Sequence, residues 1–105
     1  MAGGSEINKE KNVTKVALSG EAIAGKGVYD EACQTCHNAG IAGAPKTGDK
    51  SAWIDRIGQG MDALNNHAIN GYQGADGVMP AKGGNMSLSD GDVMNAVAFM
   101  VESSR

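Results

Sequence analysis

Apolar side chains recur at helical spacing near the C-terminal end of this 105-residue chain. Four of them share one face of a helix predicted over about residues 90–102: Val93, Ala96, Val97 and Met100. Ser89 and Asp92 occupy the two key positions of a capping box, so they predict where this helix begins. We therefore expect the chain to finish in one amphipathic helix.

A second helix is predicted over about residues 20–36, with Ser19 as its N-cap. Gly25 weakens it as an isolated helix, but it lies one turn before Tyr29 on the same face. A glycine at this place suits the close approach of another backbone.

Two shorter helices are predicted in the middle of the chain. Asp49 is a suitable N-cap for residues 50–57, and another pattern runs over about residues 62–70 before a glycine. Loops rich in glycine and proline cover residues 38–50 and 72–87. No run of β-branched residues suits a buried strand, so we predict an all-α fold of four or five short helices.

The first 18 residues are polar and charged, with few apolar residues among them. We interpret residues 1–18 as a polar N-terminal arm and residues 19–105 as one domain. The chain starts without an apolar leader, so we expect a mature form that lacks its signal peptide. No stretch approaches the roughly 18 apolar residues of a transmembrane helix.

The segment Cys33-Gln34-Thr35-Cys36-His37 has the spacing C-x-x-C-H, the attachment signal for a c-type haem. Each thiol can form a thioether bond to a haem vinyl group, and the adjacent histidine can bind the iron. On a helix these three side chains lie at i, i+3 and i+4, so they face one side. The motif predicts one covalently bound haem c.

Two other kinds of site use a C-x-x-C pair. A thioredoxin-like dithiol is expected at a helix N-terminus after a buried strand, whereas a helix precedes Cys33 here. A structural zinc ion takes four ligands, but this chain has two cysteines and two histidines, and His67 is far from the motif. Both alternatives stay open and fit less well than haem.

Composition also favours a cofactor in the core. The chain has 16 Gly and only four aromatic residues among its 105. Protein side chains alone would give a thin core in so small a domain, whereas a haem supplies a large apolar body. We therefore expect the haem-free chain to fold poorly. The net charge of −3 argues against nucleic-acid binding.

A second iron ligand is expected among His67 and the methionines. Met79 stands apart because it lies in a loop, between Gly77 and Pro80, and a restricted loop can hold a thioether in place. His67 is interpreted as a half-buried packing residue. Four other methionines lie in or beside predicted helices, where methionine commonly fills gaps in a core: Met61, Met86, Met94 and Met100.

These features together resemble a small bacterial class I cytochrome c. The C-x-x-C-H motif is followed by Met79-Pro80-Ala81-Lys82-Gly83-Gly84 and by a helix that opens at Leu88-Ser89-Asp90. Residues 40–46 and the segment Trp53-x-x-Arg56-Ile57 resemble the cytochrome c5 group. The resemblance covers about residues 19–102 and implies the cytochrome c fold, with short helices wrapped around one covalent haem.

The resemblance also implies a role for each residue of the site. His37 and Met79 would be the axial ligands of the iron, and Cys33 and Cys36 the thioether attachments. The carbonyl of Pro45 would accept a hydrogen bond from the His37 ring and orient it, as outer partners of metal ligands do.

Further contacts follow from the same resemblance. Trp53 and Arg56 would contact a haem propionate, since both are hydrogen-bond donors; the alternatives are core packing for the tryptophan and a solvated charge for the arginine. Gly25 would meet the terminal helix. Asn85 and Leu88 stand where related proteins often carry a second cysteine pair, so that brace is absent here.

With both axial positions filled, the iron can only exchange single electrons. We therefore predict a soluble monohaem one-electron carrier, a monomer and not an enzyme. It would serve transient redox partners in the bacterial periplasm, such as a quinol-oxidising complex and a terminal oxidase or reductase. The alternatives are a haem-based gas sensor, in which Met79 dissociates, and an electron-entry domain of a larger redox enzyme.

Overall fold

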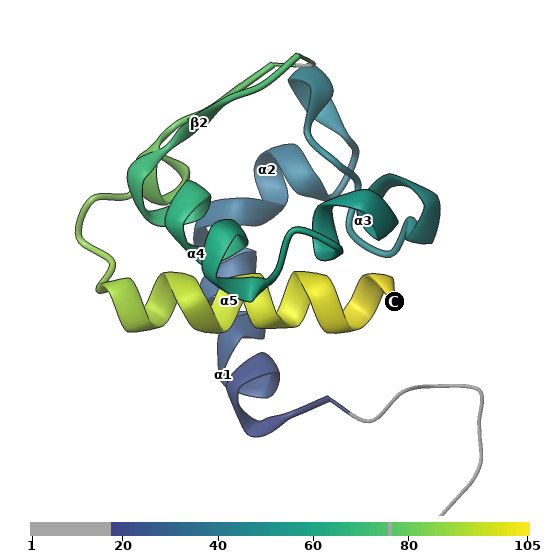
Figure 1. Ribbon diagram of the computed structural model, residues 1–105. Helices are drawn as coiled ribbons and strands as arrows, with labels where there is room; N and C mark the ends of the chain where they lie inside the picture. Colours follow the sequence, from purple (N-terminus) through teal and green to yellow (C-terminus); the bar gives the residue numbers. More distant parts are fainter. Residues whose placement is uncertain (1–17, 76) are drawn as a thin grey trace, which may run out of the picture.

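Helices that cross around a single core make up most of the fold (Figure 1). The computed structural model describes residues 18–75 and 77–105. The arm predicted over residues 1–18 lies outside the described part, except for its last residue. Within the described part, no helix is long and apolar enough to cross a membrane.

The N-terminal helical run consists of three successive segments: α1 (Gly20–Val28), the π-helical turn η2 (Tyr29–Cys33) and α2 (Gln34–His37). The Ala22 N–H donates to Ser19 Oγ at 3.1 Å, which confirms the predicted N-cap. The helix predicted over residues 20–36 is therefore present and one residue longer. The π turn was not predicted, and such turns are frequent at functional sites.

The run crosses helix α5 (Asp90–Ser104) at Gly25 (Figure 1). A Cβ atom on Gly25 would lie 1.8 Å from the carbonyl oxygen of Asn95, so only glycine permits this approach. One turn further on, the rings of Tyr29 and Phe99 pack with their centroids 5.0 Å apart. The predicted contact of Gly25 with the terminal helix is confirmed.

Helix α5 is held at both ends. The Asp92 N–H donates to Ser89 Oγ at 3.0 Å and the Ser89 N–H donates to Asp92 Oδ2 at 3.3 Å, which confirms the predicted capping box. Near the other end, the N–H and the hydroxyl of Ser19 each donate to the carboxylate of Glu102 at 2.7 Å. The helix continues two residues beyond its predicted end, to Ser104.

Helices α3 (Lys50–Ile57) and α4 (Met61–Asn70) lie above α5 in the view of Figure 1. Asp49 Oδ1 accepts from two N–H groups of the first turn of α3, as the sequence predicts. Buried side chains from η2, α3, α4 and α5, with Leu88 just before α5, form one core: Tyr29, Cys33, Trp53, Leu64, Ala68, Leu88, Val93, Ala96, Val97, Met100 and Val101.

A short ladder follows α4 and was not predicted. Strand β2 (Tyr72–Gln73) pairs antiparallel with β3 (Val78–Met79), and Tyr72 stands opposite Met79. At the tip of this ladder a Cβ on Gly77 would lie 2.3 Å from the carbonyl oxygen of Ala42, in the turn η3 (Ile41–Gly43). The all-α cytochrome c fold is confirmed, with this ladder as a local addition.

Candidate haem site

The three residues of the C-x-x-C-H motif lie at the end of the N-terminal helical run. Cys33 is the last residue of the π turn, and Cys36 and His37 are in the single turn α2. Cys33 is buried, Cys36 is half-buried and the His37 side chain is only 7% exposed. The motif therefore lies on the inner side of the helical run, next to the core.

His37 is oriented by the loop that follows it. Its Nδ1 lies 3.0 Å from the carbonyl oxygen of Pro45, and the Thr47 N–H donates to the His37 carbonyl at 2.7 Å. A carbonyl can only accept, so Nδ1 carries the proton and Nε2 keeps its lone pair. The hydrogen bond predicted between His37 and Pro45 is confirmed.

The surroundings of His37 favour its neutral form. Burial lowers the pKa of the imidazole, and the positive charge of Arg56 lowers it further, while the hydrogen bond to Pro45 acts in the opposite direction. A neutral imidazole is the form that binds a metal ion. His37 is thus prepared as a ligand through Nε2.

Trp53 makes a hydrogen bond that the sequence did not predict. Its indole N–H donates to the carbonyl oxygen of Lys46 at 3.0 Å, and its ring centroid lies 6.2 Å from that of His37. A contact between Trp53 and a propionate stays a prediction. Trp53 is buried in the core and braces the loop beside His37.

Arg56 is half-buried on α3, three residues after Trp53. One of its guanidinium nitrogens donates to the Ala52 carbonyl at 2.5 Å. Its charge is close enough to influence the pKa of His37, which places a cation on this side of the site. A contact between Arg56 and a propionate stays a prediction.

Met79 lies in β3 and its half-buried side chain packs against the core. Among the alternative methionines, Met86 and Met94 are 66% and 44% exposed, whereas Met100 is buried in the core. Met61 packs on the edge of the core at the start of α4. Exposure therefore argues against Met86 and Met94 as ligands, and Met79 remains the proposed one.

His67 packs against Tyr72, as a packing residue would. The two rings stack with centroids 4.1 Å apart and an interplanar angle of 28°. His67 is half-buried, as predicted. This stack joins α4 to the strand that pairs with Met79.

The alternatives to haem gain no support. Burial raises the pKa of the Cys33 thiol to about 11, whereas a reactive dithiol needs a lowered thiol pKa. In residues 18–75 and 77–105, no three side chains of His, Cys, Asp or Glu come together as a metal site.

Comparison with known proteins agrees with this geometry. Residues 20–100 match the family described as "Cytochrome C oxidase, cbb3-type, subunit III". Cytochrome c-555 of Chlorobaculum tepidum is 55% identical over 89 residues, which cover 85% of this chain and 82% of the relative. Cytochrome c5 of Ectopseudomonas mendocina is 39% identical over 70 residues, covering 65% and 76%.

The chain belongs to the class I c-type cytochromes. A solved structure, described as an electron transfer complex of nitrite reductase with cytochrome c, contains a chain that matches this cytochrome with a TM-score of 0.71 and 39% identity. The match covers 85% of this chain and all of the other. The cytochrome carries one covalently attached haem c and is a monohaem electron carrier.

The residues of this cytochrome fit a haem. The donors comprise an imidazole with a free Nε2, a thioether and two thiols, which is the set that haem c takes. Three buried polar atoms have no hydrogen-bond partner among the described residues: Tyr29 Oη, Thr47 Oγ1 and Asn65 Oδ1. Unpaired buried polar atoms of this kind are expected beside a cofactor that carries polar substituents of its own, as a haem does.

Sequence reasoning missed two supports of the site. The Thr47 N–H donates to the His37 carbonyl, and the only sequence feature that could have indicated this bond is the position of Thr47 two residues after Pro45. Lys82 binds the start of α5, and nothing in its spacing indicated that contact.

Proposed function

We propose that this cytochrome carries single electrons with His37 and Met79 as the axial ligands of its haem iron. The hydrogen bond from His37 Nδ1 to the Pro45 carbonyl carries this proposal, because it fixes both the tautomer and the ring of the histidine. Cys33 and Cys36 would hold the haem by thioether bonds on the same helical face.

Each of these residues contributes a separate part of the function. The haem iron supplies the redox chemistry, a change between its ferrous and ferric states. His37 and Met79 would hold the iron, and methionine ligation would raise its reduction potential. Trp53 and Pro45 keep the His37 ring in one orientation, so little rearrangement accompanies the electron. We infer no catalysed reaction, since no residue of the site is needed as an acid, base or nucleophile.

Partners would dock briefly at the tips of the loops around the site. Ile41, Tyr72 and Val78 are exposed apolar side chains there, and Gly77 joins the ladder to η3. Small exposed apolar surfaces are typical of weak redox encounters. The structural relative in complex with nitrite reductase supports a reductase as acceptor. A quinol-oxidising complex as donor and the bacterial periplasm as compartment belong to the same proposal.

Carbon monoxide tests the closed site. We expect the reduced protein at neutral pH to show no spectrum of a carbon monoxide complex, because Met79 occupies the position that the gas needs. The Met79→Ala variant should bind the gas, while Met86→Ala, changed at an exposed methionine, should behave like the wild type. Binding by the wild-type protein would favour the gas sensor instead.

A further inference from the structure

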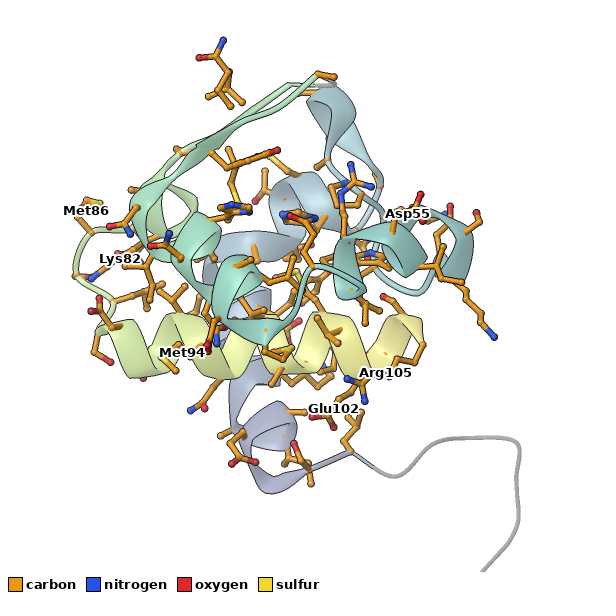
Figure 2. All side chains as sticks on the ribbon, viewed as in Figure 1. Asp55, Lys82, Met86, Met94, Glu102 and Arg105 are labelled. Carbon is orange, nitrogen blue, oxygen red and sulfur yellow. The ribbon has the colours of Figure 1, made fainter. Side chains whose placement is uncertain are left out.

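Lys82 makes two contacts that tie the segment after Met79 to the beginning of α5. Its Nζ donates to the carbonyl oxygen of Leu88 at 2.8 Å and lies 3.1 Å from Oδ1 of Asp90. The lysine side chain is only 16% exposed, although lysine is rarely buried unless it is paired. Figure 2 shows Lys82 beside the loop that leads into α5.

Helix electrostatics do not explain this position. The N-terminus of a helix carries partial positive charge, which repels a cation. Lys82 also has a left-handed backbone, with φ of 54°, which a residue other than glycine adopts only where its surroundings hold it. The helix dipole and the left-handed backbone both disfavour this position of Lys82. The Leu88 carbonyl and the Asp90 carboxylate therefore hold the lysine in place.

Within the described residues, Leu88 packs in the core, but the backbone hydrogen bonds of the segment are local. Three backbone hydrogen bonds form consecutive turns: Gly83 N–H to the Pro80 carbonyl, Asn85 N–H to the Lys82 carbonyl and Leu88 N–H to the Asn85 carbonyl. Both cysteines of the chain belong to the haem motif, so no disulfide can close the segment. The Lys82 side chain spans it directly, from the turn η4 (Ala81–Gly84) to the cap of α5.

We propose that Lys82 is a positioning residue that keeps Met79 on the iron by fastening its loop to α5. This inference rests on the ligand role proposed above for Met79. If the loop moved away, Met79 would no longer hold the iron, and an external ligand could bind in its place. Lys82 shifts this equilibrium toward the closed loop, because opening would break a charge-assisted hydrogen bond.

Imidazole binding to the oxidised holoprotein measures loop opening, since imidazole competes with Met79 for the iron. We expect Lys82→Met to bind imidazole about tenfold more tightly, the effect of losing one hydrogen bond to a charged group. Lys82→Arg should restore most of the wild-type affinity. Lys26→Met is the matched control, because Lys26 pairs with Asp30 at 2.9 Å on the exposed side of α1.

A double-variant comparison separates positioning from general stability. In a Met79→Ala background the Lys82→Met change should leave imidazole affinity unaltered, because the group that Lys82 positions is gone. Equal tightening in both backgrounds, or equal effects of Lys82→Met and Lys26→Met, would overturn the proposal. If Met79→Ala itself binds imidazole no better than the wild type, the ligand assignment fails instead.

Discussion

Replacing Gly25 by alanine should force apart the two helices at the centre of the fold. The new Cβ would lie 1.8 Å from the carbonyl oxygen of Asn95 and 2.7 Å from the Ala96 nitrogen. Both are backbone atoms, so no side-chain rotation can relieve the contact. The helices would have to separate by more than about 1 Å in a region packed as densely as a crystal.

The cost can be scaled from the packing at this crossing. Ala22, Ala96 and Val101 are completely buried there, so separation loosens contacts on both helices. Overpacking usually costs about 1–3 kcal/mol, and backbone movement puts Gly25→Ala at or above about 3 kcal/mol. The total free energy of unfolding of a small domain is only about 5–15 kcal/mol.

Gly27→Ala is the matched control in the same helix. A Cβ there meets nothing within 4 Å, so the substitution should only improve helix propensity. It should stabilise the protein by about 0.5–1 kcal/mol. Guanidinium unfolding of the oxidised holoprotein, followed by circular dichroism, measures both variants. Equal stability of Gly25→Ala and Gly27→Ala would refute the close helix crossing.

Two further substitutions test individual contacts. Trp53→Phe removes the donor to the Lys46 carbonyl and should lower the free energy of unfolding by about 1 kcal/mol. The midpoint potential of this variant should stay near that of the wild type. A clear shift of the potential would instead support a contact between Trp53 and a propionate. Hydrogen bonds from Ser19 hold the pKa of the Glu102 carboxyl below its ordinary value of 4.5. Their contribution is complete above that pH and is lost as the pH falls through the lowered pKa. Acid titration of stability should therefore be flatter in Glu102→Gln, and identical acid curves would contradict this contact.

Local signals predicted the helices well. Asp49 and Gly58 bracket α3 at its predicted bounds, because an N-cap carboxylate and a following glycine act through adjacent backbone groups. The capping box of α5 is equally local. Its end was placed two residues early, since Ser104 offers no apolar signal: its buried hydroxyl instead binds Met100 and Gly48.

Features that depend on distant contacts were missed. The ladder of Tyr72 and Met79 has two-residue strands, which are too short to show alternation. The π turn ending at Cys33 has the same composition as an ordinary helix. The hydrogen bond from Trp53 to the Lys46 carbonyl was not predicted, because this acceptor lies beside the indole only once the loop is folded. Spacing along the chain indicated the candidate ligands, whereas the hydrogen bonds of Thr47, Trp53 and Lys82 become visible only in the folded structure.

The absorption spectrum of the oxidised protein tests the central assignment most directly. Iron bound to a methionine sulfur gives a weak charge-transfer band at long wavelength. We predict that Met79→Ala abolishes this band, while Met61→Ala and Met86→Ala keep it. Survival of the band in Met79→Ala, or its loss in either of the other two variants, would contradict the closed His37 and Met79 site.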